Sequence, residues 1–206
     1  MTAQAVRQTA TPPRRAQAAK TAAIAKAKAV APARAARIGS TPKTKFRGDP
    51  DVFGRLVEDH DRHRALLAMI EDTQGAPDER EALFDELTRE LKSHAAAEEQ
   101  ALWSTVLRDP ETTDFARHAI AEHKELDDML ADLAARDMGT PAWRVRFAAL
   151  KDEYLHHIRE EEQEQFVAAE KRLSDRDRRH MRGVFERRKR AEKAAAVIEK
   201  KIRLKD

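Results

Sequence analysis

Apolar side chains recur at spacings of three and four residues along four long stretches of the chain. This spacing places them on one face of an α-helix, and it predicts helices near residues 51–73, 79–107, 111–136 and 141–172. β-branched and aromatic residues are too sparse to favour strands. Long helices joined by short connections pack as antiparallel neighbours. The pattern therefore predicts an all-α, up-down-up-down four-helix bundle.

Prolines mark the boundaries between these stretches. From residue 50 onward the prolines are Pro50, Pro77, Pro110 and Pro141, and each has Asp, Thr or Gly close before it or Asp just after it. A proline at the first helical position, behind a capping residue, is typical of a helix start. Ser174 can cap a fifth, strongly basic helix that runs toward the C-terminus.

Charge divides the chain into three parts. Residues 1–48 carry 11 basic and no acidic residues, residues 49–170 carry 14 basic and 31 acidic residues, and the remainder carries 15 basic and 6 acidic residues. We predict a disordered basic tail over 1–48, a bundle domain over 49–172 and a basic C-terminal helix over 173–206. The basic helix is expected either to stay solvated or to dock on the acidic bundle, and both basic ends could bind nucleic acid or an anionic membrane surface nonspecifically.

The absence of cysteine excludes several classes of site. With no Cys in the chain, disulfides, thiolate zinc fingers, Cys-ligated iron–sulfur clusters and Cys nucleophiles are ruled out. No apolar run approaches the roughly 20 residues that cross a bilayer, and no secretory signal is evident. We expect a soluble, cytoplasmic protein. The arginine-rich, acid-free start of the chain is also typical of an organelle transit peptide.

The polar exceptions within the apolar stripes are histidine and glutamate, and they form an internal repeat. The sequence His94-x-x-x-Glu98-Glu99 recurs 63 residues later around His157 and Glu161. The pair Asp59-His60 likewise recurs at Glu122-His123, again 63 residues later. The chain therefore contains two copies of a helix pair, each with a His followed by His-x-x-x-Glu.

The spacing predicts that these histidines meet. The midpoint of each consecutive pair among His60, His94, His123 and His157 falls in or just before a predicted turn, so antiparallel helices bring all four to one level of the bundle. Glutamates four residues on lie one turn away on the same faces. Such a core would hold several uncompensated polar groups unless metal ions bind them. Imidazole and carboxylate ligands suit Fe, Mn or Zn, and two bridging carboxylates favour a two-metal site.

Over about residues 50–170 the chain resembles the hemerythrin-like (HHE) cation-binding domain family. The Glu122-His123 start of the third helix and the paired His-x-x-x-Glu-Glu motifs, with Trp103 and Phe166 trailing them, carry the resemblance. It implies a non-heme di-iron centre in a four-helix bundle, with the two glutamates bridging the ions. The implied metal ligands are His60, His94, Glu98, His123, His157 and Glu161.

The chain departs from the pattern of oxygen-carrying hemerythrins on the third helix. These proteins have His-x-x-x-His there, whereas Asp127 stands four residues after His123. His63 is a candidate replacement from another helix, with an outer or surface position as the alternative. Tyr154 is a candidate hydrogen-bond donor to a bound oxygen species or a ligand glutamate, with an ordinary core position as the alternative.

The expected function is binding of O2, or of a related small oxidant such as NO or peroxide, for sensing, storage or scavenging. One alternative is a di-iron peroxidase or catalase-like enzyme that uses the same residues. The other is an interaction protein in which metal only stabilises the bundle while the basic ends bind nucleic acid. No substrate-binding signature, nucleophile triad or phosphate loop occurs elsewhere in the chain, so whether the protein is an enzyme stays open.

Overall fold

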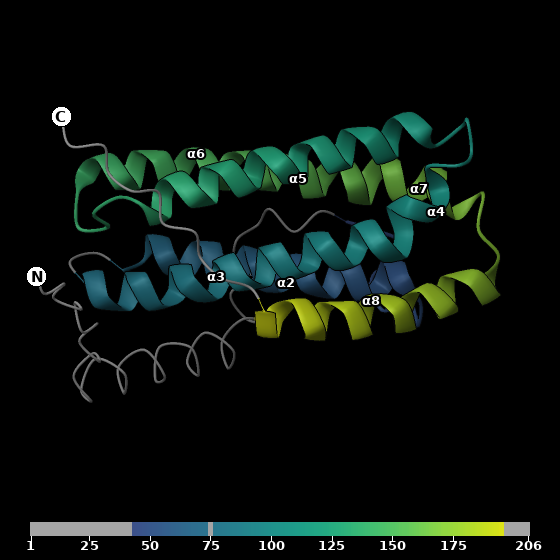
Figure 1. Cartoon of the computed structure of the whole chain (residues 1–206), viewed down its shortest axis with the longest axis horizontal. Helices are drawn as coiled ribbons and strands as arrows, with labels where there is room; N and C mark the ends of the chain where they lie inside the picture. The colour runs from purple at the N-terminus through teal and green to yellow at the C-terminus, as the bar shows by residue number, and fades with distance from the viewer. Residues whose placement is uncertain (1–42, 74–75, 196–206) are drawn as a thin grey trace, which may run out of the picture.

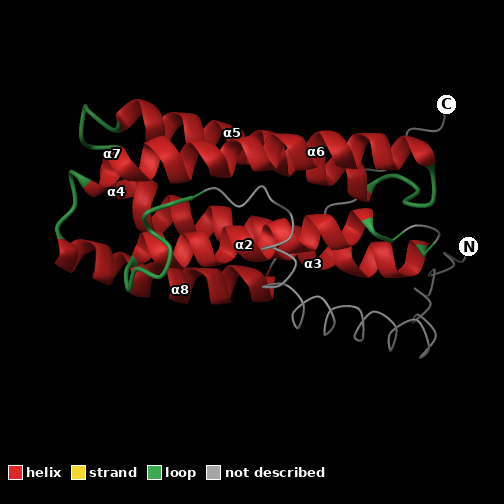
Figure 2. Ribbon diagram, turned by 180° about the vertical axis from the view of Figure 1, so that it is seen from behind, coloured by secondary structure: helices red, strands yellow, loops and turns green. Residues whose placement is uncertain are grey.

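A computed structural model describes residues 43–73 and 76–195 of the chain. All of its regular elements are helices, and no strand occurs among these residues (Figure 2). The long helices are α2 (Val52–Glu71), α3 (Pro77–Glu98), α5 (Thr113–Ala134), α6 (Pro141–Glu160) and α8 (Asp175–Ala195). Two π-helices, η1 (Glu99–Trp103) and η2 (Glu161–Gln165), continue α3 and α6 and lead into the short helices α4 (Ser104–Val106) and α7 (Phe166–Glu170). The predicted helical-bundle fold is confirmed.

The helices pack as two pairs with a fifth helix added to one of them. α2 lies against α3, and α5 lies against α6 (Figure 1). α8 packs on α2 and α3, on the side away from α5 and α6. Of the two expectations for the basic helix, docking on the bundle is therefore the one that the structure bears out.

Local sequence explains where the helices begin. The Asp51 carboxylate accepts hydrogen bonds from the backbone N–H groups of Phe53 and Gly54 and so caps α2. Pro77 and Pro141 stand in the first turns of α3 and α6, as predicted. Ser174 accepts from the backbone N–H of Asp177, three residues into α8. The turn residues thus fix the helix boundaries that set the height of each side chain in the bundle.

The segment just before α2 contributes to the core. Phe46 is fully buried, with its ring centroid 4.9 Å from that of Phe53 and 6.1 Å from that of Phe166. A Cβ atom at Gly54 would lie only 2.1 Å from the backbone oxygen of Asp49, so this close approach requires glycine. Phe46 therefore differs from the prediction for residues 1–48. Residues 1–42 of the predicted tail and 196–206 of the predicted C-terminal helix lie outside the described residues.

Two apolar clusters fill the bundle, and the predicted metal level lies between them. On α2, for example, Val57 belongs to one cluster and Leu66 to the other, with His60 in between. α3 and α5 show the same alternation around His94 and His123, whereas along the fourth helix the second cluster begins only at Phe166 of α7. None of the described helices combines the length and the apolar character that crossing a membrane requires.

Candidate metal centre

The four repeat histidines meet in the interior, one from each helix of the two pairs. The ring centroids of His60 and His94 are 5.1 Å apart, and those of His123 and His157 are 5.0 Å apart. All four side chains are buried. The structure therefore brings these residues to one level, as the spacing predicted.

Two buried glutamates lie between the histidine pairs. Glu161 places one carboxylate oxygen 3.3 Å from Nε2 of His60 and the other 3.5 Å from Nε2 of His157. Glu98 places one oxygen 3.5 Å from Nε2 of His94, and the same oxygen lies 3.6 Å from Nε2 of His123. Each carboxylate thus faces one histidine from either half of the repeat, which is the position that a bridging ligand occupies.

The atoms that point into this space lack hydrogen-bond partners. Nε2 of His60, His94 and His123 and both carboxylate oxygens of Glu98 and Glu161 are buried without one. Buried polar groups are normally satisfied, because an unpaired group loses its hydration without compensation. Cations placed among these nitrogens and oxygens would satisfy them together. The residues present therefore fit a metal centre.

Among the buried residues that the structure describes, two groups of ligand atoms are close enough to hold a metal ion each. In one, His60, His94 and Glu161 place their ligand atoms within 4.8 Å of one another, and in the other His123, His157 and Glu161 do so. Glu161 belongs to both groups. Imidazole nitrogen with carboxylate oxygen is a donor set that suits Fe, Mn or Zn.

A ring of carboxylates surrounds the histidines and orients them. Nδ1 of His60 lies 2.8 Å from Glu162, and Nδ1 of His157 lies 2.8 Å from Glu122. The other two rings follow the same rule, with Nδ1 of His123 2.9 Å from Glu99 and Nδ1 of His94 3.2 Å from Asp59. Donation from Nδ1 turns each Nε2 toward the centre and strengthens it as a ligand.

Sequence reasoning did not assign a role to these four carboxylates, although the signal was present. Each of them is the immediate neighbour, in sequence, of a predicted ligand: Asp59, Glu99, Glu122 and Glu162 flank His60, Glu98, His123 and Glu161. The four carboxylates therefore recur with the same offset of 63 residues as the predicted ligands beside them.

The carboxylates also control how the metal-free histidines bind protons. Burial lowers the pKa of His60, but its close contacts with the carboxylates of Glu161 and Glu162 outweigh burial and raise the pKa to about 9. For His123, burial is likewise outweighed by close contacts with the carboxylates of Glu98 and Glu99, which raise the pKa to about 10. Burial would raise the pKa of Glu98, yet His123 and His94 hold it below its usual value. In the metal-free centre, the His60 and His123 side chains therefore bind protons more tightly than free histidines do.

α3 and α6, the helices that lead to the two central glutamates, each widen into a π-helix at the centre. η1 begins directly after Glu98 and η2 begins at Glu161. π-helical turns occur mostly as insertions at functional sites. Behind them, Trp103 and Phe166 are fully buried with ring centroids 6.2 Å apart, and Phe166 stacks 6.0 Å from His60. These aromatics close one end of the centre. The π-helices themselves had no signal in the apolar pattern.

Tyr154, His63 and Asp127, which the sequence singled out beside the repeat residues, lie outside the two groups of ligand atoms. The Tyr154 hydroxyl lies 2.5 Å from Nδ1 of His63, so its partner is this histidine rather than a ligand glutamate. His63 is fully buried, but it belongs to neither metal-holding group. Asp127 forms an ion pair with Lys92 at 3.1 Å on the surface.

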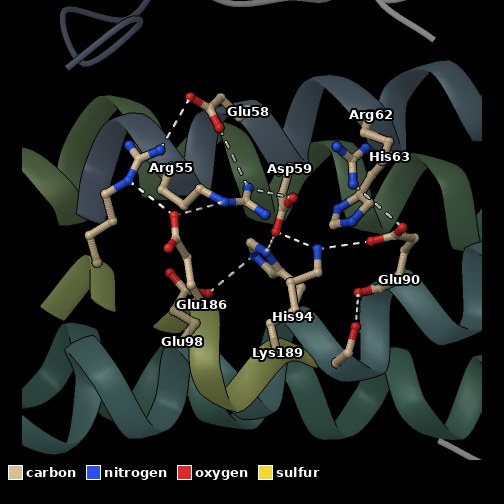
Figure 3. Close-up of polar contacts among 12 residues, drawn as sticks. Arg55, Glu58, Asp59, Arg62, His63, Glu90, His94, Glu98, Glu186 and Lys189 are labelled. Atoms are coloured by element: carbon tan, nitrogen blue, oxygen red, sulfur yellow. Dashed lines mark hydrogen bonds and ion pairs between the residues drawn. The ribbon is translucent and has the colours of Figure 1, made fainter. Parts of the chain in front are cut away.

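α8 closes the side of the centre next to His94 (Figure 3). Lys189 is buried and forms ion pairs with Asp59 and, at 2.8 Å, with Glu90. Phe185 approaches the His94 ring edge-on, with centroids 5.6 Å apart. Burial would raise the pKa of Asp59, but its hydrogen bond with His94 and the charge of Lys189 hold that pKa well below its usual value. A helix outside the predicted bundle thus contacts the centre.

A cleft in the surface reaches the second histidine pair. It has a volume of about 430 Å³ and lies between α3 and α5, with His123 and Glu99 among its lining residues. Ala95 and Ala96 form part of its α3 wall, and Glu192 of α8 also lines it. The centre therefore meets the solvent-facing surface at His123.

Comparison with known proteins identifies the helical bundle. The family model described as Hemerythrin HHE cation binding domain matches residues 51–169. None of the curated proteins and none of the solved structures matches the chain. The matched range contains the four histidines, the two glutamates between them and both π-helices, and it ends before α8.

Proposed function

Since the chain belongs to the hemerythrin HHE cation-binding domain family, we propose that it is a non-heme di-iron protein. It binds O2, or a related small oxidant such as NO or peroxide, for sensing, storage or scavenging. In this proposal the iron ligands are His60, His94, Glu98, His123, His157 and Glu161.

The observation that carries the proposal is the set of unpaired atoms in the core. Three imidazole nitrogens and four carboxylate oxygens are buried without hydrogen-bond partners, and they face one shared space. Glu98 and Glu161 each face histidines from both halves of the repeat, which supports a bridging role for both. Iron bound there would supply the electrons that a small oxidant accepts.

The access route supports a small ligand. The cleft ends on His123, whose side chain is only 5% exposed, so a molecule must be small to pass beyond this ring. The aromatic pair Trp103 and Phe166 and helix α8 cover other sides of the centre. A diatomic molecule or peroxide meets these limits.

The experiment is metal analysis combined with optical spectroscopy. We expect two iron ions per chain and a visible absorption band that changes when the reduced protein meets O2 or NO. Rapid disproportionation of peroxide would favour the alternative of a catalase-like enzyme at the same residues. Zinc as the only bound metal, with no response to oxidants, would overturn the proposal.

The contacts of the basic C-terminal helix weaken the alternative that this helix binds nucleic acid. Several of its cations are already paired with the bundle, including Lys189 with Asp59 and Arg178 with Asp51 and Glu170. Binding of the chain to duplex DNA that weakens steeply with added salt would support that alternative. Absence of such binding would leave the metal centre as the basis of function.

A further inference from the structure

A second cluster of histidines and glutamates lies on the surface behind the metal centre. It consists of His118 and Glu122 on α5 and of His156 and Glu160 on α6, and we refer to these four residues as the outer cluster. His118 and His156 are 54% and 52% exposed. Each helix supplies a His-x-x-x-Glu pair, the spacing that places two ligands on one helix face. An ion in solution can reach the cluster directly.

Three contacts within the outer cluster have the length that separates neighbouring ligand atoms around a bound metal ion. Nε2 of His118 lies 3.3 Å from a Glu122 oxygen and 3.2 Å from a Glu160 oxygen. Nε2 of His156 lies 3.2 Å from the other Glu160 oxygen. Ligand atoms around a tetrahedral zinc ion, at bond lengths of about 2.0–2.1 Å, are about 3.3–3.4 Å apart. His118, Glu122 and Glu160 accordingly form one of the groups whose ligand atoms could hold an ion.

The hydrogen bond between His118 and Glu160 accounts for only one of these contacts. Nε2 of His118 carries at most one proton, yet it faces carboxylate oxygens from two different helices at nearly equal distances. A single N–H shared between both oxygens would make only a divided hydrogen bond. A cation placed between the three atoms would contact all of them.

The internal repeat shows which charge the outer cluster lacks. Glu122 corresponds to Asp59, and each carboxylate orients one histidine of the metal centre. Asp59 is held by two permanent cations, Arg55 at 2.7 Å and Lys189. The position of Arg55 is taken in the second half by His118, an imidazole, which is cationic only when protonated. A divalent ion would supply the positive charge that arginine and lysine supply in the first half.

We propose that the outer cluster is a third metal site, a surface zinc site formed by two imidazoles and two carboxylates. Nitrogen and oxygen donors in this number suit Zn²⁺. The second oxygen of Glu122 accepts from Nδ1 of His157 at 2.8 Å, so the surface ion shares a carboxylate with a residue of the inner centre. The site is separate from the di-iron centre, and it stands or falls independently of the proposed function.

Zinc titration of the metal-free full-length chain tests this site. We expect the His118→Ala, His156→Ala double variant to bind one zinc ion fewer per chain than the wild type. His180→Ala is the matched control, because His180 is also an exposed helical histidine but lies on α8, away from the cluster. It should bind as much zinc as the wild type. Equal stoichiometry in the wild type and the double variant would overturn the proposal.

A second variant separates the outer site from the inner centre. Glu98→Ala, Glu161→Ala removes both carboxylates that lie between the inner histidines but leaves the outer cluster intact. This variant should retain one zinc ion, and its X-ray absorption spectrum at the zinc edge should show two imidazole ligands. Complete loss of zinc from this variant would overturn the outer site. The variant could also retain its zinc ion while the wild type binds this one ion and no other metal. That result would support the outer site and count against the di-iron centre.

Discussion

Lys189 donates a hydrogen bond to the same carboxylate oxygen of Asp59 that faces Nδ1 of His94. Lys189 comes from α8, which lies beyond the range matched by the family model. One buried ammonium group therefore links an added helix to the orientation of a proposed metal ligand. The two halves of the repeat differ here, because Glu122 faces the exposed His118 where Asp59 faces Lys189 and Arg55.

The first prediction concerns Lys189→Met. Methionine keeps much of the volume but leaves the fully buried Asp59 with one cation fewer. Removing one partner of a buried ion pair is expected to lower the free energy of unfolding by about 3 kcal/mol. Loss of an outer-shell contact typically weakens metal binding by roughly tenfold or more. Urea unfolding and competition with a chromophoric chelator measure the two effects.

The control for this variant is Arg188→Met, one residue away. Arg188 is exposed and pairs with Glu192 on its own helix, so its loss should change neither quantity appreciably. If Lys189→Met lowers stability but leaves the metal affinity of the chain unchanged, then α8 contributes packing alone and the link through Asp59 is refuted.

The helices, and the common level of the four repeat histidines in the bundle, could be predicted from the sequence because both depend on local signals. Pro77 and Pro141 stand at helix starts, and the equal distances of the histidines from the turns follow from helix geometry alone. The ring of carboxylates and the place of Lys189 could not be predicted in this way. They depend on how each helix is rotated about its axis and on where α8 docks, which packing decides. The buried position of Phe46 was missed for the same reason, since one aromatic in a basic segment gives no periodic signal.

The second prediction concerns the two central glutamates. Glu161 contacts His60 with one oxygen and His157 with the other, and its removal should leave both proposed metal positions incomplete. We expect Glu98→Ala and Glu161→Ala each to abolish binding of two iron ions per chain, measured by elemental analysis. Glu164→Ala, an exposed neighbour, should keep full iron content. Two iron ions per chain in the Glu98→Ala, Glu161→Ala double variant would exclude the di-iron assignment.

The third prediction concerns protons. With pKa values of about 9 and 10, His60 and His123 are protonated in the metal-free protein at pH 7.5. Metal ions bind the neutral ring, so loading should release about two protons per chain from these residues. Calorimetric titration in buffers of different ionisation enthalpy measures this number. Release of no protons at pH 7.5 would show that the two histidines are neutral before metal binds.

The same two pKa values set the pH dependence of stability in the metal-free protein. Both are raised above the reference value of 6.5, so the native state holds these protons more tightly than the unfolded chain does. The resulting stabilisation is fully present below pH 6.5 and is lost as the pH rises through 9 and 10. The melting temperature of the metal-free protein should therefore fall over this range. The melting temperature of the metal-loaded protein should not fall over this pH range. A melting temperature of the metal-free protein that does not change with pH would contradict the raised pKa values of His60 and His123.

The fourth prediction concerns the cleft between α3 and α5. Ala96 lines this cleft, which reaches His123, so Ala96→Phe should narrow the path without touching a proposed ligand. We expect unchanged iron content, together with slower reaction of the reduced protein with O2 or NO in stopped-flow measurements and slower removal of iron by a chelator. Ala142→Phe, at an exposed position near the start of α6, is the matched control and should leave these rates unchanged. If the Ala96→Phe rates equal those of the wild type, small molecules enter by another route, and the contact of the cleft with His123 has no part in ligand access.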